Sequence, residues 1–256
     1  MSGIGTYRES SLHRSLKFRY ADSGKTEISI GGYVCDGLSD DGELIEVQTG
    51  SFGPLKNKIK ALSQDKKVRI IYPVVVNKYI ELYDTEGNLL YRRKSPLKGC
   101  IWDVFGALLY APELCTASNV TIELSLLDIA EKRVNDGKGP WRRRGVTLGD
   151  KVPIAWHESI IIKKPYDYNI FVPFDRGISF SVKDLSEKAK IKQPLARKCL
   201  YVLNKAGLIE KTGKNGKAIL YKKKAQKINR ILIFNKDLTR KQERTFIAIT
   251  PHSHIL

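Results

Sequence analysis

Two strand-like runs joined by a short polar turn constrain the fold of this chain more than any other segment. The first run covers residues 32–37 (GYVCDG) and the second covers residues 43–49 (ELIEVQT). Successive side chains of a strand face opposite sides, so Glu46 and Gln48 share a face and Val47 points away from them. We therefore expect a β-hairpin that carries carboxylates on both strands.

The length of the turn decides whether Asp36 joins Glu46. A three-residue loop over 40–42, with Gly42 in the left-handed conformation, places Asp36 opposite Glu46. A two-residue loop would instead pair Asp36 with Val47 and separate the acids. The position of Gly42 favours the first register. Two carboxylates about 5 Å apart repel each other unless a cation lies between them, and Mg²⁺ binds one or two protein carboxylates together with water and phosphate oxygens.

The charge of the chain indicates a polyanionic partner. Its 256 residues carry a formal net charge of +18, and 42% of them are hydrophobic, as in a globular protein. Such a basic chain attracts nucleic acid first and an anionic membrane surface second. The sequence has no apolar run long enough for a transmembrane helix and no secretory signal, so we expect no membrane partner.

The four cysteines, Cys35, Cys100, Cys115 and Cys199, are scattered and form no C-x-x-C pair. This spacing argues against a zinc knuckle and against a disulfide framework. It suits a reducing compartment, so the sequence predicts a cytoplasmic protein.

The positive charge concentrates towards the C-terminus. Residues 181–230 contain fifteen Lys and Arg against three Asp and Glu. Pro165, Pro173 and Gly177 cluster just before this segment and favour a boundary there. We therefore expect two domains, one over residues 1–170 and a basic one over residues 171–256.

Hydrophobic periodicity predicts an α/β fold with a mixed central sheet flanked by helices. The helices are expected at residues 6–20, 54–62, 99–110, 182–188 and 193–206. The strands are expected at residues 26–38, 43–49, 68–76, 79–83, 89–91, 120–127, 156–163, 208–211 and 217–222. Further strands of unclear destination are expected at 231–234 and 246–250.

A helix with Glu9, a hairpin with Asp36 and the strand motif Glu46-Val47-Gln48 together resemble the PD-(D/E)xK nuclease superfamily, which has the restriction-endonuclease-like fold. The resemblance covers roughly the first third of the chain, and the motif itself is short. It implies a metal-dependent endodeoxyribonuclease. Asp36 and Glu46 would bind Mg²⁺ or Mn²⁺, and Glu9 would support the metal directly or through water.

Two positions depart from the superfamily pattern. Cys35 stands where the family has Pro, and Gln48 stands where it has Lys. The resemblance implies that Gln48 positions the nucleophile without carrying a charge. Lys56 or Lys58 from the next helix would then supply the missing cation. We expect Lys58, because Lys56 neighbours a leucine of the buried stripe.

Residues 178–224 resemble a winged helix-turn-helix domain, which implies binding to double-stranded DNA. The second helix would present a recognition surface, and the Asn215-Gly216 turn would form the tip of a basic wing. The recognition helix contributes Lys192, Gln193, Arg197 and Lys198, and the wing contributes Lys211, Lys214 and Lys217. The loop over 135–145, with Trp141 followed by Arg142, Arg143 and Arg144, is a second candidate contact to the DNA backbone, and a plain surface loop is the alternative.

The sequence thus predicts a DNA endonuclease. One alternative is a catalytically inactive nuclease-like scaffold that acts as a DNA-binding regulator or assembly factor; another is an RNA-binding or RNA-cleaving protein. The acids of the hairpin could also be ordinary turn and surface residues. His13 follows Glu9 by four residues, so one alternative places it beside that acid and against a phosphate; we expect it instead to be a partly exposed surface residue of the first helix. Nucleases of the superfamily often work as dimers, but the sequence shows no dimer seam.

Overall fold

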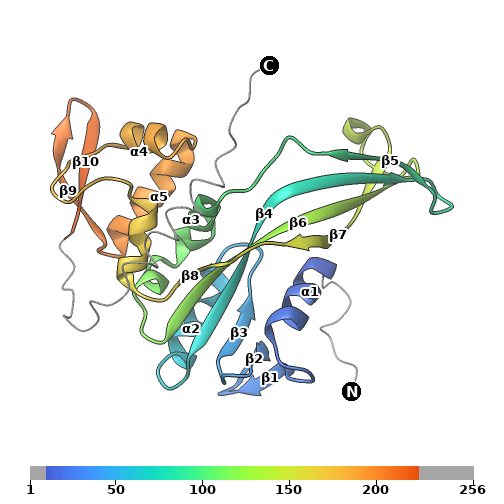
Figure 1. Cartoon of the computed structure of the whole chain (residues 1–256), viewed down its shortest axis with the longest axis horizontal. Helices are drawn as coiled ribbons and strands as arrows, with labels where there is room; N and C mark the ends of the chain where they lie inside the picture. The colour runs from blue at the N-terminus through green and yellow to red at the C-terminus, as the bar shows by residue number, and fades with distance from the viewer. Residues whose placement is uncertain (1–9, 225–256) are drawn as a thin grey trace. The chain divides into compact units, whose positions relative to one another are not determined.

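The computed structural model describes residues 10–224 of the chain. Glu9 and the strands expected at 231–234 and 246–250 lie outside the described residues. The described part confirms a mixed α/β fold in which helices flank a central mixed sheet (Figure 1).

The central sheet has the strand order β1-β2-β3-β4-β6-β7, with β5 on the free flank of β4 and β8 pairing with β6. The strands β3, β4 and β6 run parallel to one another, whereas the other pairs are antiparallel. The bounds of the strands are β1 Thr26–Ile30, β2 Tyr33–Leu38, β3 Leu44–Val47, β4 Val68–Tyr83, β5 Leu89–Lys94, β6 Val120–Asn135, β7 Val146–Trp156 and β8 Ile160–Ile162.

The two longest strands, β4 and β6, lie side by side through the middle of the sheet (Figure 1). The sequence predicted β4 as two separate strands, but it continues through a register shift between Val75 and Asn77. Pro73 is tolerated within β4 because β3 ends opposite Ile71 and leaves one flank of β4 free there. The strand β7 was not predicted, and only Trp156 at its end fell within an expected strand.

Helix α1 (Ser11–Tyr20) packs on the sheet through its apolar stripe. Leu12 and Leu16 are buried against residues of β3, β4 and β6. The residues of this core cluster are Leu12, Leu16, Ile45, Val47, Ile71, Leu127 and Ile129. Ser10 caps the helix by accepting a hydrogen bond from the backbone N–H of His13 at 3.3 Å. The packing fixes α1 next to the hairpin of β2 and β3.

The hairpin has the register that the sequence predicted. Gly37 lies opposite Ile45 and Leu38 lies opposite Leu44, and Gly42 has a φ of 77°. This φ lies in the left-handed region that favours glycine. Gly31 and Gly32 separate β1 from β2, also with positive φ.

The helix expected at residues 99–110 is broken into short pieces. These are the 3₁₀ turns η3 (Ile101–Asp103) and η4 (Leu108–Tyr110), with α3 (Val104–Ala107) between them. The carboxylate of Asp103 accepts a hydrogen bond from the backbone N–H of Cys100 at 2.7 Å and fixes the first turn. Val104 and Gly106 are poor helix formers, which helps to explain why no long helix forms.

The remaining short helices lie between strands of the sheet or, for η7, after its last strand. They are η2 (Gly53–Leu55), α2 (Lys56–Leu62), η5 (Pro112–Cys115), η6 (Trp141–Arg143) and η7 (Pro165–Phe171). No helix among residues 10–224 has both the length and the apolar character needed to cross a bilayer.

After η7 the chain forms two helices and a hairpin of its own. These elements are α4 (Val182–Lys188), α5 (Gln193–Lys205), β9 (Ile209–Asn215) and β10 (Ala218–Lys223). Ser181 and Asp184 cap the start of α4 reciprocally. Gly216 has a φ of 57° in the turn between β9 and β10, where the sequence predicted a hairpin turn. The core of these elements contains the buried side chains of Leu185, Cys199, Val202 and Leu203, and Ala189, Ile191 and Leu195 are half-buried beside them.

Candidate active site

Asp36 lies where β2 and β3 separate. If the register of the hairpin continued, Asp36 would pair with Glu46. Instead, the side-chain carboxylate of Asp36 serves as the acceptor for a backbone N–H of β3. Its Oδ2 accepts a hydrogen bond from the backbone N–H of Val47 at 2.7 Å. The last two paired positions are Gly37 and Leu38, so the strands part directly beside this carboxylate. The carboxylate of Asp36 thus lies at the end of the hairpin ladder.

Two side chains of α1 lie next to Asp36. His13 Nε2 lies 3.5 Å from Asp36 Oδ2, and Lys17 Nζ lies 3.9 Å from Asp36 Oδ1. His13 Nε2 is also 3.0 Å from the carbonyl oxygen of Val47. His13 is partly exposed, as expected, but its ring is directed at the hairpin. Lys17 is almost fully buried and is also paired with Glu27 at 3.1 Å.

Glu46 is buried on β3 and forms an ion pair with Lys58 of α2. Because Ile45 and Val47 pack against α1, the alternation of the strand directs Glu46 away from α1. Lys58 Nζ also donates to the carbonyl oxygen of Val34 at 2.5 Å, which holds the ammonium group over the hairpin. The structure thus brings Lys58 to Glu46, whereas Lys56 pairs at 2.7 Å with Glu113.

The pKa of Glu46 is shifted upwards from its usual value. Burial raises the pKa of Glu46; the ion pair with Lys58 opposes this shift, and the nearby charge of Asp36 adds to it. Burial likewise raises the pKa of the Cys35 thiol to about 12, and the charge of Glu46 contributes. The two hairpin carboxylates thus influence each other electrostatically although each contacts a cation from a different helix.

Gln48 follows the last residue of β3 and is half-buried. Its backbone N–H continues the sheet by donating to Ile71 O at 2.9 Å. Its side-chain amide donates to the carbonyl oxygen of Ser51. Among the described residues, no protein donor engages the amide oxygen of Gln48, which can therefore accept a hydrogen bond from water.

The donors at this site have the chemistry that Mg²⁺ prefers. The carboxylate of Asp36 and the carbonyl oxygen of Val47 lie beside α1, whereas the carboxylate of Glu46 is directed towards Lys58 of α2, so the structure does not bring the two acids together on one face. Within residues 10–224, no group of three or more His, Cys, Asp or Glu side chains is gathered closely enough to hold a metal. Glu9, the predicted third acid, lies outside that range.

Sequence reasoning missed the cations that surround Asp36. Lys17 follows Leu16 and stands at the edge of the apolar stripe of α1, a position at which a lysine normally reaches solvent. The sequence does indicate that such partners are needed, because the acids of the hairpin require positively charged neighbours once they are buried. The sequence does not show which lysine turns inwards.

The predicted DNA-binding residues of α5 and the hairpin are all exposed. On α5 the exposed stripe is Gln193, Arg197, Tyr201 and Lys205, which recur every four residues. The opposite face of α5 is buried and packs against α3 and the neighbouring turns. Lys198 reaches towards α3, since a Cβ added to Gly106 would lie 4.0 Å from its Nζ.

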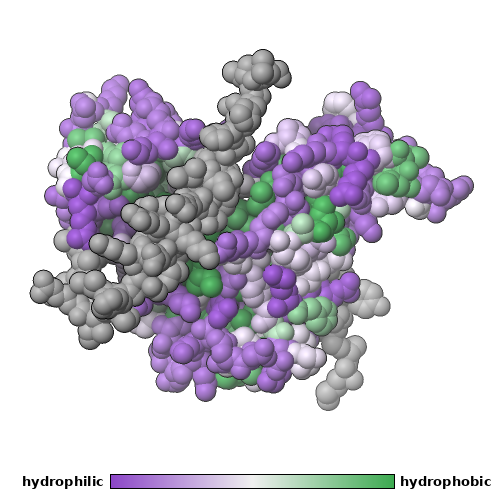
Figure 2. All heavy atoms as spheres, viewed as in Figure 1, coloured by the Kyte–Doolittle hydropathy of each residue, from purple (hydrophilic) through white to green (hydrophobic). Residues whose placement is uncertain are grey.

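The exposed residues of the β9–β10 hairpin are predominantly basic and polar. Lys211, Lys214 and Lys217 are exposed, as are Lys192 and Arg197 on the helix. Figure 2 shows that hydrophilic side chains cover most of the visible face over α4, β9 and β10. This part of the surface is suited to a polyanion.

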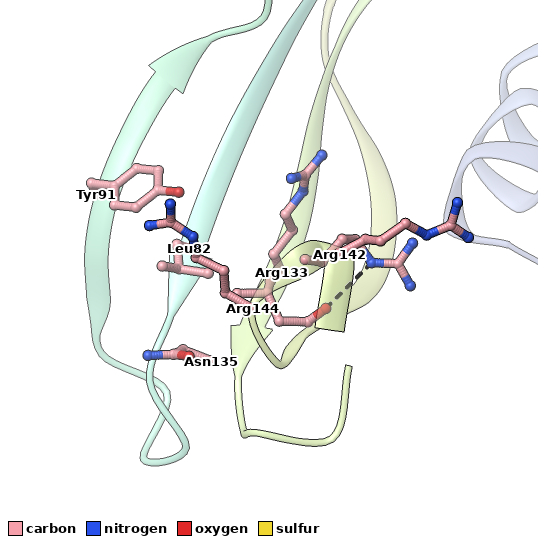
Figure 3. Close-up of a pocket in the computed structure, with 8 residues that line it drawn as sticks. Leu82, Tyr91, Arg133, Asn135, Arg142 and Arg144 are labelled. Atoms are coloured by element: carbon pink, nitrogen blue, oxygen red, sulfur yellow. Dashed lines mark hydrogen bonds between the residues drawn. The ribbon is translucent and has the colours of Figure 1, made fainter. Parts of the chain in front are cut away.

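The three consecutive arginines lie in a separate place. Arg142 and Arg143 belong to η6, and Arg144 follows it with φ 52° and ψ 43°. They line a pocket with Arg133 of β6 and Tyr91 of β5 (Figure 3). The structure therefore has two basic surfaces, one on the C-terminal elements and one beside β5 and η6.

Comparison with known proteins gives a family and one relative. Residues 10–163 match the family described as "Domain of unknown function (DUF8091)". A protein of Treponema pallidum (strain Nichols), described as "Uncharacterized protein", is 30% identical over 149 residues. The aligned region covers 58% of this chain and 59% of that relative. No solved structure matches the chain significantly.

Proposed function

The chain belongs to the DUF8091 family, and we propose that it is a metal-dependent DNA endonuclease that hydrolyses phosphodiester bonds. One observation carries the proposal: the carboxylate of Asp36 lies at the point where β2 and β3 part, and its charge acts on Glu46, which is buried on the other side of the hairpin and paired with Lys58. Buried acids with perturbed pKa values and a specific cationic partner are typical of catalytic sites.

Each residue of this site has a proposed role. Asp36 and Glu46 would hold Mg²⁺ or Mn²⁺, with Glu9 supporting it. The ion would polarise the phosphate and lower the pKa of a water molecule. Gln48 would orient the attacking water through its amide oxygen. Lys58, already beside Glu46, would stabilise negative charge that develops on the phosphate.

The arrangement of elements supports a restriction-endonuclease-like domain. Helix α1 packs beside the β2–β3 hairpin, and β3 continues into a parallel pairing with β4. The order of helix, hairpin and parallel strand is the order on which the resemblance to the PD-(D/E)xK superfamily depends. The resemblance assigns the metal site to Asp36 and Glu46, and this assignment is part of the proposal.

The C-terminal elements support a winged helix that binds double-stranded DNA. Helix α5 presents an exposed polar stripe, and the β9–β10 hairpin carries exposed lysines at its turn. Lys192, Gln193 and Arg197 would approach the DNA groove, and Lys211, Lys214 and Lys217 would contact phosphates. Lys198 lies nearer α3 and would contribute least.

A plasmid-nicking assay tests the enzymatic proposal. The full chain is incubated with supercoiled plasmid and Mg²⁺ or Mn²⁺, and nicked and linear products are measured. We expect Asp36→Asn and Glu46→Gln to abolish cleavage, because both remove a metal-binding charge while preserving shape. Asp40→Asn is the matched control, since Asp40 is an exposed acid in the turn of the same hairpin. Equal cleavage by all three variants would exclude this site.

A DNA-binding scaffold without activity is the second candidate. Gln48 favours it, because its side-chain amide is engaged by Ser51 and carries no charge. Under this reading the chain binds duplex DNA with every metal tested and nicks none. A regulator or assembly factor built on the same fold would show this behaviour.

The compartment and the oligomeric state are also proposals. All four cysteines are free thiols, and Cys35, Cys115 and Cys199 are buried. Unpaired thiols support a reducing compartment such as the cytoplasm. A homodimer would allow paired cuts in both DNA strands.

A further inference from the structure

A pocket of about 500 Å³ beside η6 is lined by four arginines. Arg133 comes from β6, and arginines 142–144 come from η6 and the residue that follows it. Figure 3 shows Arg144 extending towards Tyr91, Arg133 standing between the two sides, and Arg142 extending away in the opposite direction. The labelled guanidinium groups therefore point in different directions and not at a single spot.

The positive charge of this pocket is only partly compensated. Arg133 donates through Nε and Nη2 to Glu131 Oε1 at 2.9 and 2.5 Å. Lys78 shares the same carboxylate group at 3.0 Å. In the part of the chain that the structure describes, no acidic side chain forms an ion pair with arginines 142–144. Several positive charges thus face solvent within one pocket, which favours binding of an anion with spaced charges.

The backbone around η6 is built to present these arginines. Gly139 N–H donates to Gly145 O at 2.9 Å and closes the loop. A Cβ added to Gly139 would lie 2.0 Å from the carbonyl oxygen of Val146, so only glycine fits there. Arg144 adopts the left-handed conformation, which is strained for a residue other than glycine. The loop therefore holds the backbone of arginines 142–144 in a closed turn.

Two exposed aromatic side chains accompany the arginines. Trp141 directly precedes the three arginines and is 86% exposed, and Tyr91 lines the pocket and is 44% exposed. An exposed ring can stack on an unpaired base, whereas the bases of a duplex are already stacked on one another. Aromatic side chains beside a row of positive charges are typical of surfaces that bind single strands.

We propose that this pocket binds a single-stranded segment of nucleic acid, with its phosphates on the arginines and its bases on Trp141 and Tyr91. The proposal rests on the proposed function to the extent that the chain acts on nucleic acid. The single-strand site adds a preference among DNA substrates. A duplex with an unpaired end would bind more tightly than a blunt duplex.

Fluorescence anisotropy with two labelled DNA substrates tests this preference. One substrate is a blunt duplex, and the other is the same duplex with an oligo(dT) overhang of about 12 nucleotides, within the range of known single-strand sites. We expect the full chain to bind the overhang substrate about tenfold more tightly. The triple variant Trp141→Ala, Arg142→Ala, Arg144→Ala should lose this preference, because its loss of affinity is larger for the overhang substrate than for the blunt duplex.

Matched controls separate the pocket from general charge. Arg93→Ala removes an exposed arginine of β5 that does not line the pocket, and it should keep the preference. Trp141→Phe retains an aromatic ring, so this variant should keep most of the preference for the overhang substrate. Thermal melting checks that the triple variant is folded, and Arg142→Lys with Arg144→Lys provides a milder change that should weaken overhang binding alone.

Several outcomes would overturn the proposal. The first is that the full chain binds both substrates with equal affinity. The second is that the triple variant loses the same affinity for both substrates. The third is that AMP displaces the labelled overhang substrate at a lower concentration than oligo(dT) does. Cleavage is measured separately on the same samples. If plasmid is never nicked but the overhang preference persists, the nuclease proposal fails while the single-strand site stands.

Discussion

Lys58 of α2 forms an ion pair with Glu46 of β3 and also donates to the carbonyl oxygen of Val34 on β2. The lysine therefore joins a helix to both strands of the hairpin that carries the candidate active site. Glu46 is 3% exposed, so its charge depends on this partner. Lys58 therefore has a structural role, and its contribution to the free energy of unfolding can be measured separately from any role in cleavage.

We predict that Lys58→Met lowers the free energy of unfolding by about 3 kcal/mol at neutral pH, because the variant leaves the charge of Glu46 buried without its partner. Urea denaturation followed by circular dichroism measures the change. Adding Glu46→Gln should recover most of the loss, since the buried charge is then gone. Lys56→Met is the matched control: its exposed ion pair with Glu113 is worth less than about 1 kcal/mol. Equal losses in both lysine variants would contradict the prediction.

A second buried acid makes stability depend on pH. Asp128 of β6 accepts hydrogen bonds from the backbone and side chain of Asn77 and lies 2.9 Å from His157 Nε2. Burial alone would raise the pKa of Asp128, but the contacts with His157 and Asn77 outweigh it and lower this pKa below its usual value. The charged form is therefore the one that the fold stabilises.

For Asp128 the predicted pH dependence has a definite sign. A lowered pKa contributes stability above the unfolded value of about 3.9 and loses it as the pH falls through the folded value. We expect Asp128→Asn to be about 2 kcal/mol less stable at pH 7, with the difference shrinking below about pH 4. Urea titrations at several pH values measure this. The exposed Asp65→Asn should show no such trend, and a constant difference for Asp128→Asn would contradict the assignment.

The hairpin register was predictable because local signals encode it. Gly42 marks the left-handed position of the loop, and the two-residue period of the strand assigns Glu46 to one face. The choice of Lys58 over Lys56 rested on the leucine beside Lys56, and two residues apart on a helix point to roughly opposite sides. Both are short-range properties of the chain.

The features that the sequence did not reveal depend on pairing between strands that are far apart in the chain. β4 continues past Asn77 because β6 and β5 pair with it there, and no local pattern shows those partners. β7 has mostly half-buried and exposed residues, so its hydrophobic pattern is weak. Asp36 turns to the backbone N–H of Val47 only because the strands part at that point.

The β9–β10 hairpin allows a test of DNA binding by its salt dependence. Each lysine that contacts a phosphate contributes about 0.9 to the slope of log K against log salt concentration. We expect Lys214→Ala with Lys217→Ala to reduce the slope by about 2 and to weaken binding for all duplex sequences alike. Lys66→Ala with Lys67→Ala removes the same charge from another exposed turn and should leave the slope nearly unchanged. Equal effects of the two pairs would indicate only an effect of net charge.

Gln48 is the residue on which the choice between an enzyme and a scaffold depends. If its amide oxygen orients the attacking water, Gln48→Ala should lower the nicking rate about 100-fold, the usual contribution of a positioned polar group. Stability should change by less than about 1 kcal/mol, because the lost bond joins a half-buried side chain to the backbone of Ser51. Thr49→Ala, at the exposed neighbouring position, is the control. An unchanged rate in Gln48→Ala would leave Gln48 with only the structural contact to Ser51.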